Sequence, residues 1–200
     1  MSRTDKATQR QQLRRARQSL TRSQRRNATR RSNSALKPCI RRARRIGVYW
    51  PVGSELRLDD FVRAALARGA RVYLPYIEPH SLRLWFTPYC ANTAHAERAR
   101  GQSRLRIPQF GGRKIRAHQL HTLIVPLVGI DRHGYRLGQG GGYYDVTLAH
   151  TRARLRPHTI GVGFACQQVA QLPREAHDMP LDAFVCEHGL QRFGSHQSSF

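Results

Sequence analysis

Short apolar runs bounded by turn residues are the main pattern of the chain after residue 45. Runs of this length suit buried strands, because a buried helix needs a longer apolar segment. Pro51 and Pro75 mark the ends of two runs, and a third alternates in the way that a half-exposed strand does. We therefore predict strands over Ile46–Trp50, Val72–Leu74, Leu82–Phe86, Leu123–Val128, Thr159–Phe164 and Ala183–Glu187.

The first 45 residues have a different pattern, with many good helix formers and few β-branched residues. This composition predicts helices over residues 4–20 and 22–45. Thr21 and Gln24 have the spacing of a capping box, which marks the start of the second helix. The first helix should dock only loosely, because its apolar stripe is narrow and consists of Leu13, Ala16 and Leu20.

Two further helices are predicted between strands. Asp59 is expected to cap a helix that runs through Arg68 and closes at Gly69. Another helix is expected to start at Tyr144 and to continue through Arg154. The strand–helix–strand order favours parallel pairing with a right-handed crossover. The predicted fold is a three-layer α/β/α sandwich with a mostly parallel sheet and an N-terminal helical arm packed over one side.

The length of 200 residues suits one ordinary domain with its own core. We assign residues 1–188 to this α/β domain, with residues 1–45 as its basic helical arm. Residues 90–118 are polar, basic and glycine-containing, which predicts mostly connecting chain. Residues 189–200 are predicted to form a flexible tail.

The charge of the chain is unusual. It contains 35 Lys and Arg residues against 12 Asp and Glu residues, a net charge of +23. Residues 1–46 hold 16 of the basic residues and only Asp5 on the acidic side, so this segment alone carries +15. Such a segment attracts nucleic acid, anionic membranes, or polyphosphate and polyglutamate ligands. A transit peptide and a codon bias towards arginine are alternative explanations.

Four separated cysteines, Cys39, Cys90, Cys166 and Cys186, form neither a CxxC motif nor a Cys/His ligand set. Their spacing favours reduced thiols in a cytosol-like compartment, and we predict a cytoplasmic location. His118, His121 and His133 are interpreted as ordinary polar residues, since none has further ligands at metal spacing. No apolar run has the length of a membrane span, so no membrane partner is expected.

The segment after the strand Leu123–Val128 is rich in glycine, from Gly138 to Gly142, with Arg136 before it and Asp145 after it. Glycine allows positive φ angles and lets backbone N–H groups turn towards a ligand. A loop of this kind before a helix can bind an anion, and an arginine can add a two-pronged phosphate contact. It is neither a Walker loop nor a dinucleotide fingerprint, because no Gly-Lys-Ser/Thr follows and Tyr143 replaces the third glycine. A flexible surface loop is the alternative.

Asp131, the step Arg136-Leu137-Gly138, the glycine run and Tyr143-Tyr144-Asp145 closely resemble the signature of the 5-formyltetrahydrofolate cyclo-ligase family. The segment Leu172–Asp182 matches that family's Pro-x-Glu-x-His-Asp stretch. Near the N-terminus, Arg10 and Arg14 fit its Lys-x-x-x-Arg pattern, with arginine in place of lysine. The chain departs from the family's Ile-x-Glu-Pro, since Gln109 replaces the acid and Phe110 the proline, and we assign no site there.

The resemblance implies an ATP-dependent ligase of the NagB/RpiA/CoA-transferase fold type that converts 5-formyltetrahydrofolate into 5,10-methenyltetrahydrofolate through a phosphorylated formyl group. It implies that Arg10, Arg14 and Arg136 neutralise the ATP phosphates. The residues around these phosphates would be Leu137, Gly138, Gln139, Gly140, Gly141 and Gly142. It further implies Mg²⁺ at Asp145 and Asp178, folate against Trp50 and Glu55, and Tyr143 and Tyr144 beside the pterin or the nucleotide.

Each of these residues also has a purely structural interpretation. Arg10 and Arg14 could belong to a solvated basic face, and Glu55 could be a solvated loop acid. Trp50 could be a core residue. Asp145 could favour the dipole of the helix that it opens, and Asp178 could serve a turn.

Two other functions remain open at this stage. The basic N-terminal segment would suit a nucleic-acid-binding protein on a former enzyme fold, although residues 1–46 contain no aromatic residue for base stacking. A different nucleotide-dependent enzyme could also use the same scaffold. The expected partners are therefore 5-formyltetrahydrofolate, with or without a polyglutamate tail, and nucleic acid as the alternative. We expect a monomer or a weak dimer.

Overall fold

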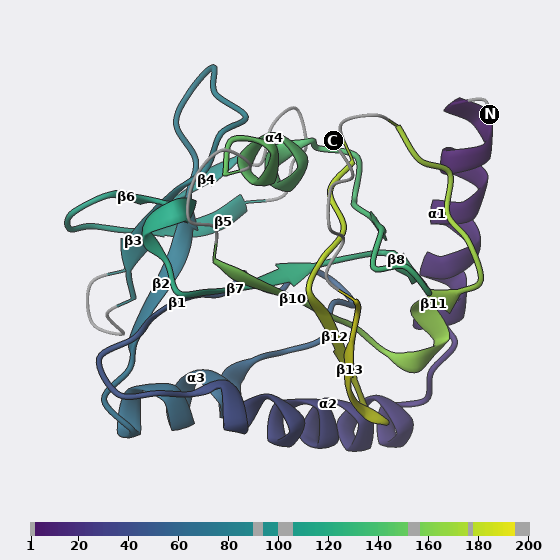
Figure 1. Cartoon of the computed structure of the whole chain (residues 1–200), viewed down its shortest axis with the longest axis horizontal. Coiled ribbons are helices and arrows are strands. Elements are labelled where there is room, and N and C mark those ends of the chain that lie inside the picture. Colours follow the sequence, from purple (N-terminus) through teal and green to yellow (C-terminus); the bar gives the residue numbers. More distant parts are fainter. Residues whose placement is uncertain (1–2, 90–93, 100–105, 152–156, 176–177, 195–200) are drawn as a thin grey trace.

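The computed structural model describes residues 3–89, 94–99, 106–151, 157–175 and 178–194. A mixed sheet forms its centre (Figure 1). The sheet has eight strands in the order β13 (Gly189–Arg192), β12 (Ala183–Cys186), β10 (His158–Val162), β7 (Thr122–Pro126), β1 (Arg45–Gly47), β2 (Arg71–Tyr76), β3 (Trp85–Pro88) and β6 (Ile115–Arg116). Pairing is parallel from β12 to β2 and antiparallel towards both edges, which confirms the prediction of a mostly parallel α/β sheet.

The apolar runs form strands because the centre of the sheet is covered on both faces. Leu123, Ile124 and Val125 follow one another in β7 and all have no exposed surface. Consecutive side chains of a strand point to opposite faces, so such a run is stable only when both faces are buried. All four residues of β12 are buried in the same way.

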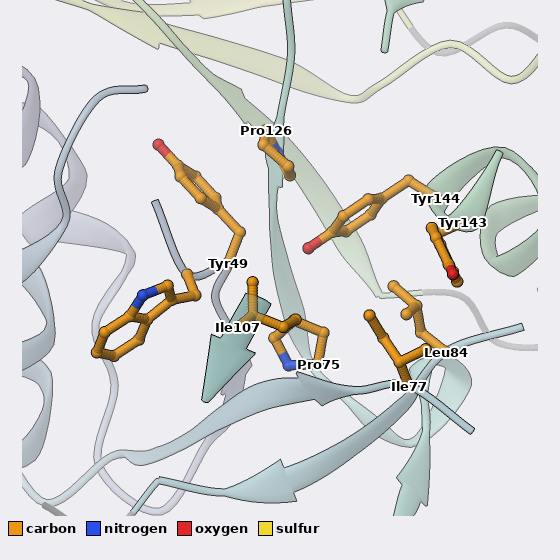
Figure 2. A pocket seen from close by; sticks show the side chains of 9 residues that line it. Tyr49, Pro75, Ile77, Leu84, Ile107, Pro126, Tyr143 and Tyr144 are labelled. Carbon is orange, nitrogen blue, oxygen red and sulfur yellow. The ribbon is translucent and has the colours of Figure 1, made fainter. Parts of the chain in front are cut away.

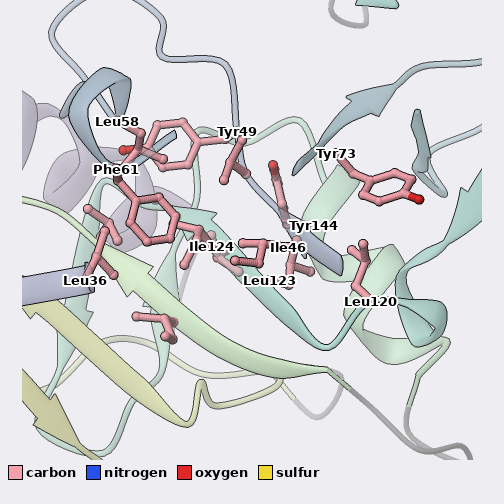
Figure 3. Packing of buried hydrophobic residues seen from close by; sticks show 14 of the residues in the cluster. Leu36, Ile46, Tyr49, Leu58, Phe61, Tyr73, Leu120, Leu123, Ile124 and Tyr144 are labelled. Atoms are coloured by element: carbon pink, nitrogen blue, oxygen red, sulfur yellow. The ribbon is translucent and has the colours of Figure 1, made fainter. Parts of the chain in front are cut away.

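Helices α2 (Arg22–Leu36) and α3 (Asp59–Ala67) cover one face of the sheet (Figure 1). The predicted capping box is present, since Gln24 N donates to Thr21 Oγ1 over 3.2 Å and Thr21 N donates to Gln24 Oε1 over 2.9 Å. Asn33 joins the two helices, because its amide accepts from Phe61 N and donates to Arg57 O. Figure 3 shows Leu36 and Phe61 of these helices packed against Ile46 and Ile124.

The opposite face carries the short helix α4 (Tyr143–Ala149) and two small sheets (Figure 1). One small sheet contains β11 (Gln168–Val169), β8 (Gly129–Asp131) and β9 (Arg136–Leu137), and the other contains β4 (Ala94–Ala99) and β5 (Arg106–Phe110). Short 3₁₀ turns occupy Lys37–Cys39 (η1), Ala117–Gln119 (η2) and Ala165–Gln167 (η3). Because it contains one short helix and two small sheets, this layer is thinner than the outer helical layer of a typical three-layer sandwich.

Helix α1 (Arg3–Gln18) stands beside β8 and β11 as the predicted arm (Figure 1). Leu13 is buried in a small cluster with Val128, Leu137 and Leu172. The approach is close, since a Cβ added to Gly129 would lie 2.5 Å from Leu13 Cδ1. Among the described residues no helix is long and apolar enough to cross a lipid bilayer.

Three helix boundaries differ from the prediction. The second helix ends at Leu36 rather than residue 45, because Pro38 cannot continue an α-helix and sits in η1 instead. Asp59 is the first helical residue and not a cap, since its carboxylate pairs with Arg57. The last helix ends at Ala149, and Arg154 lies outside the described residues.

The predicted strands also needed correction. β2 runs through Pro75, which is tolerated because β1 has already ended and β2 has only β3 beside it at that level. The strand predicted over Leu82–Phe86 begins later, as β3. The interpretation of residues 90–118 as connecting chain is wrong, since β4, β5 and β6 lie there. The predicted tail is wrong at its start, because β13 pairs with β12, while residues 195–200 lie outside the described part.

Candidate nucleotide and folate site

The glycine loop (Gly138–Gly142) connects β9 to α4. Gly140 has φ +97° and Gly142, the N-cap of α4, has φ +69°. Both angles belong to the left-handed region, so these two glycines are conformationally required. With Pro126, Arg136 and Asp145, the loop surrounds a hollow with an enclosed volume of about 20 Å³. The loop therefore borders a hollow, as an anion-binding loop would, and its role in binding stays a prediction.

Helix α1 lies directly against this loop through its arginines. Arg10 Nε donates to Gly138 O over 3.0 Å. Arg14 donates to the Gln139 side-chain oxygen over 2.7 and 3.1 Å and to its backbone oxygen over 3.2 Å. Burial and the neighbouring charge of Arg14 lower the pKa of Arg10, although a guanidinium remains charged. The loop is thus held in place from outside, and the two arginines do not belong to a solvated face.

Arg136 and Asp145 form an ion pair at the mouth of the loop. Arg136 Nη2 lies 2.6 Å from Asp145 Oδ1, and the two side chains are 4% and 35% exposed. Arg136 Nε is buried and makes no hydrogen bond within the described part of the chain. The guanidinium therefore retains a donor for a ligand oxygen, and Asp145 keeps part of its carboxylate accessible.

Glu55 is buried, at 5% exposure, and is therefore not a solvated loop acid. Val52 N donates to one carboxylate oxygen over 3.0 Å, and Gln139 Nε2 donates to the other over 2.9 Å. The same Gln139 side chain accepts from Arg14, so its amide links the arginine of α1 to the carboxylate after β1. The structure brings together residues that the sequence assigned separately to the nucleotide and to folate.

A second hollow lies at the carboxyl ends of β1, β2 and β7, the edge where ligands of open α/β sheets collect. The enclosed volume of this aromatic pocket is about 20 Å³. Figure 2 shows Tyr144 extending from α4 towards Tyr49, with its hydroxyl facing the middle of the pocket. The lining consists of Tyr49, Trp50, Pro75, Ile77, Leu84, Ile107, Pro126, Tyr143 and Tyr144.

The aromatic pocket and the loop hollow adjoin, because Pro126, Tyr143 and Tyr144 line both. Trp50 is 39% exposed, so it is not a simple core residue, and its ring lies 6.4 Å from that of Phe110. Two ligands, or two parts of one reaction complex, could meet across the tyrosines.

Tyr49 was not predicted as a site residue, although it lines the aromatic pocket. Its hydroxyl donates to Leu56 O over 2.5 Å and so points away from the middle of the pocket (Figure 2). Burial raises the pKa of Tyr49 well above its ordinary value, and the Glu55 carboxylate adds to the rise. The phenol is therefore neutral and offers the pocket an aromatic face.

Asp178 lies in a turn held by the start of α1. Its Oδ2 accepts from Glu175 N over 2.8 Å and pairs with Lys6 Nζ over 3.3 Å, while Lys6 also pairs with Glu175 over 2.8 Å. Partial burial opposes the charge of Lys6, but the two carboxylates outweigh it and raise the pKa of Lys6. Arg10 interacts electrostatically with both Asp145 and Glu175, so α1 connects this turn to the glycine loop.

Lys6 and Arg17 are the site residues on α1 that the sequence interpretation missed. Lys6 and Arg10 fit the Lys-x-x-x-Arg pattern without any substitution, one helical turn before the assigned pair, so this spacing was the available signal. Arg17 is buried and donates to Ser54 Oγ over 2.9 Å, beside Glu55. No pattern in the sequence pairs Arg17 with Ser54.

Two motif residues prove to have structural contacts. The Asp131 carboxylate accepts from His133 N and Tyr135 N within its own turn, and from Leu172 N and Arg174 in the following loop. Gln109 is buried and accepts from Ile77 N over 2.9 Å. Its neutral amide satisfies a backbone donor behind the aromatic pocket.

Comparison with known proteins identifies the family. The sequence pattern of the 5-formyltetrahydrofolate cyclo-ligase family matches residues 2–187, nearly the whole chain. The chain belongs to this family. It is therefore an enzyme of the ligase class, and the resemblance inferred from the motifs is confirmed.

Several relatives carry the same name. The 5-formyltetrahydrofolate cyclo-ligase of Escherichia coli K12 is 34% identical over 152 residues, which cover 74% of this chain and 80% of that protein. The Haemophilus influenzae cyclo-ligase is 31% identical over 145 residues, covering 70% and 74%. The fold is shared with the 5,10-methenyltetrahydrofolate synthetase of Aquifex aeolicus, which superimposes with a TM-score of 0.73. The two proteins are 24% identical, and the superposition covers 98% of this chain and 99% of that one.

Proposed function

We propose that the protein converts 5-formyltetrahydrofolate into 5,10-methenyltetrahydrofolate and that it uses ATP, releasing ADP and phosphate. The observation that carries this proposal is the pair of adjoining hollows. One is formed by the glycine loop beside arginines, and the other is lined by aromatic residues, with Tyr143 and Tyr144 between them. A triphosphate and a reduced pterin have the chemistry that these two surfaces complement.

The residues of the loop hollow fit ATP phosphates. Arg10, Arg14 and Arg136 bring three guanidinium groups to the glycine loop, and the buried Nε of Arg136 has no hydrogen bond among the described residues. Guanidinium groups bind phosphate oxygens in pairs and neutralise their charge. Lys6 adds an ammonium group one turn earlier on α1. Because α1 supplies these groups, we propose that residues 1–188 act as one catalytic domain.

The residues of the aromatic pocket fit the pterin. Tyr144 and the partly exposed Trp50 offer ring faces for stacking. Glu55 would accept hydrogen bonds from the pterin, since its carboxylate is already buried and fixed by Gln139 and Val52. Folding has therefore already removed the Glu55 carboxylate from water, so ligand binding would not have to supply the free energy of desolvating it.

The proposed reaction has two steps. The formyl oxygen attacks the γ-phosphorus of ATP and ADP leaves, which gives a phosphorylated formyl group. The neighbouring folate N–H nitrogen then attacks the formyl carbon, the C–O bond to phosphate breaks, and the nitrogen's proton leaves with the phosphate as the ring closes. Phosphoryl transfer depends mainly on positioning and charge neutralisation, so the protein needs no covalent nucleophile. The arginines and the glycine loop would supply both requirements.

Asp145 and Asp178 are the residues that would hold Mg²⁺. No group of three or more His, Cys, Asp or Glu residues at metal distance occurs in the described part of the chain. Magnesium does not require one, because it combines one or two carboxylates with phosphate oxygens and water. When bound, it would neutralise phosphate charge. Asp145 is accessible for this role, whereas Asp178 would first have to exchange its contact with Lys6.

The decisive experiment follows the methenyl absorbance after purified protein is mixed with 5-formyltetrahydrofolate, Mg²⁺ and ATP. We expect product only when ATP is present. Asp145→Asn should abolish turnover while leaving the fold intact, as circular dichroism would check, because it removes the accessible charge beside the loop. Asp60→Asn is the matched control, since Asp60 forms an exposed ion pair with Arg63. Product formation without ATP, or normal turnover by Asp145→Asn, would refute the assignment.

A further inference from the structure

A basic hollow lies at the amino ends of β1 and β7, the edge of the sheet opposite the aromatic pocket. Its volume is about 440 Å³. Thr122 lines this hollow and Pro126 lines the aromatic pocket. The two residues are four positions apart in β7, roughly 13 Å at the rise per residue of a strand. The polar lining of the basic hollow is donor-rich and contains no acid: Arg41, Arg44, Arg45, His118, Gln119, His121 and Thr122.

The fold holds two of these residues and leaves two guanidinium groups available. Arg45 N donates to His121 Nδ1 over 3.0 Å, and Arg45 Nε donates to Gln119 O over 2.5 Å. Burial and the charges of Arg44 and Arg45 lower the pKa of His121. The imidazole therefore stays neutral near pH 7, with its proton on Nε2. Arg41 and Arg44 form no side-chain hydrogen bond or ion pair within the described residues.

Further basic side chains surround the hollow. Arg71 N donates to Arg44 O over 2.9 Å, and Ala43 N donates to Gly69 O over 2.8 Å, so these segments are contiguous. Arg68 Nη1 donates to Lys37 O over 3.0 Å. We call this surface the basic edge; it consists of Lys37, Arg41, Arg42, Arg44, Arg45, Arg68 and Arg71.

None of the basic-edge side chains forms an ion pair with an acid that the structure describes. Clustered like charges repel and weaken the fold, so such an edge has a cost unless an anion offsets it. The cationic groups also extend well beyond the reach of a single phosphate. A polymer with regularly spaced phosphates would contact them all.

We propose that the basic edge binds the phosphate backbone of nucleic acid without reading its sequence. Arginine forks match phosphate oxygens. No Phe, Tyr or Trp lines the hollow, so the large ring faces that usually stack on bases are absent from its lining. An anionic membrane is a poorer match, because membrane-surface elements insert apolar side chains, and the large apolar residue of the lining, Leu120, is buried. The site lies apart from the glycine loop, so nucleic acid and ATP bind independently.

The test measures binding of a fluorescein-labelled single-stranded RNA of mixed sequence by anisotropy, between 50 and 200 mM salt, a range over which the Debye length falls about twofold. The double variant R41Q/R44Q should bind at least tenfold more weakly. Its salt dependence, the slope of log affinity against log salt, should fall by roughly 1.4, because each lost phosphate contact on a single strand removes about 0.7. R41K/R44K keeps the charge and should restore most of the slope.

The matched control is R22Q/R26Q, which removes the same charge from exposed positions at the far end of α2. It should change RNA affinity by less than twofold, and both double variants should keep cyclo-ligase activity. Equal losses in the two doubles would show that net charge alone binds RNA, and would overturn the proposal. So would absent RNA binding at 100 mM salt, displacement of RNA by ATP, or tighter binding to phosphatidylserine vesicles that R41Q/R44Q abolishes.

Discussion

At the scale of single residues, Gln139 is the most informative position of the site. Its oxygen accepts from Arg14 and its NH₂ group donates to Glu55, so one amide satisfies a cation and an anion together. Leucine has a similar size and neither function. We expect Gln139→Leu to weaken 5-formyltetrahydrofolate binding roughly tenfold, the usual loss when a hydrogen bond to a charged group is removed. Calorimetry with and without ATP measures the effect.

Gln139→Glu separates positioning from simple packing. It keeps the acceptor for Arg14 but places a second carboxylate against Glu55, and two such groups repel unless they share a proton. Folate affinity of this variant should therefore decline from pH 6 to pH 8, relative to wild type. Gln139→Leu should show no added pH dependence. If the Glu and Leu variants had the same pH profile, the link between Arg14 and Glu55 would have no role in binding.

The sequence predicted much of this residue-level arrangement and missed its connections. The glycine loop, Arg136 and Asp145 could be recognised because they are adjacent in the chain and resemble a known motif. The contact of Gln139 with Glu55 joins residues that are 84 positions apart, and no local pattern reports it. Lys6 was missed although its spacing to Arg10 was visible, because Arg10 and Arg14 fitted nearly as well.

At the scale of elements, α1 matters most, because it carries cations to the loop and yet has a small apolar contact. Leu13 is its buried anchor against Val128, Leu137 and Leu172. Leu13→Ala should undock the helix, since truncating a buried leucine typically costs about 2–5 kcal/mol. We expect at least tenfold weaker ATP binding in calorimetry and faster hydrogen exchange in residues 3–18, with a nearly unchanged melt of the remaining domain.

Gln12→Ala is the control for this change, as Gln12 is exposed on the same helix. It should leave nucleotide affinity and exchange rates as they are. Nucleotide affinity that is unaffected by Leu13→Ala, in the presence of faster exchange over α1, would show that the arginines of this helix do not hold ATP.

The elements that could be predicted are those in which consecutive apolar residues in the sequence indicate burial. β7, β10 and β12 each contain at least four consecutive buried residues, and apolar side chains predominate among them. The pair β4 and β5 was missed because β4 has no large apolar side chain, and because the buried Ile107 and Phe110 of β5 are three positions apart and do not alternate. β13 was missed because its Leu190 and neighbours are largely exposed and depend on pairing with β12. The local pattern of apolar and polar residues therefore predicts buried strands well and predicts edge strands poorly.

At the scale of the whole molecule, the net charge of +23 is the property that interactions within the fold compensate least. The ion pairs of Arg57 with Asp59 and of Arg63 with Asp60 are exposed, and such pairs contribute little to stability. Repulsion among the remaining cations acts over distances comparable to the Debye length, about 10 Å at 0.1 M salt. Net repulsion should therefore outweigh surface attraction in this chain.

This balance makes a prediction about thermal stability. Raising sodium chloride from low to about 0.5 M should raise the Tm by several degrees, because screening reduces repulsion more in the compact state than in the expanded chain. A quadruple variant, R22Q/R26Q/R41Q/R44Q, lowers the net charge from +23 to +19. Its Tm should be higher than that of wild type at low salt and should depend less on salt. Scanning calorimetry measures both, and a Tm that falls as salt rises would show that attraction between opposite charges dominates instead.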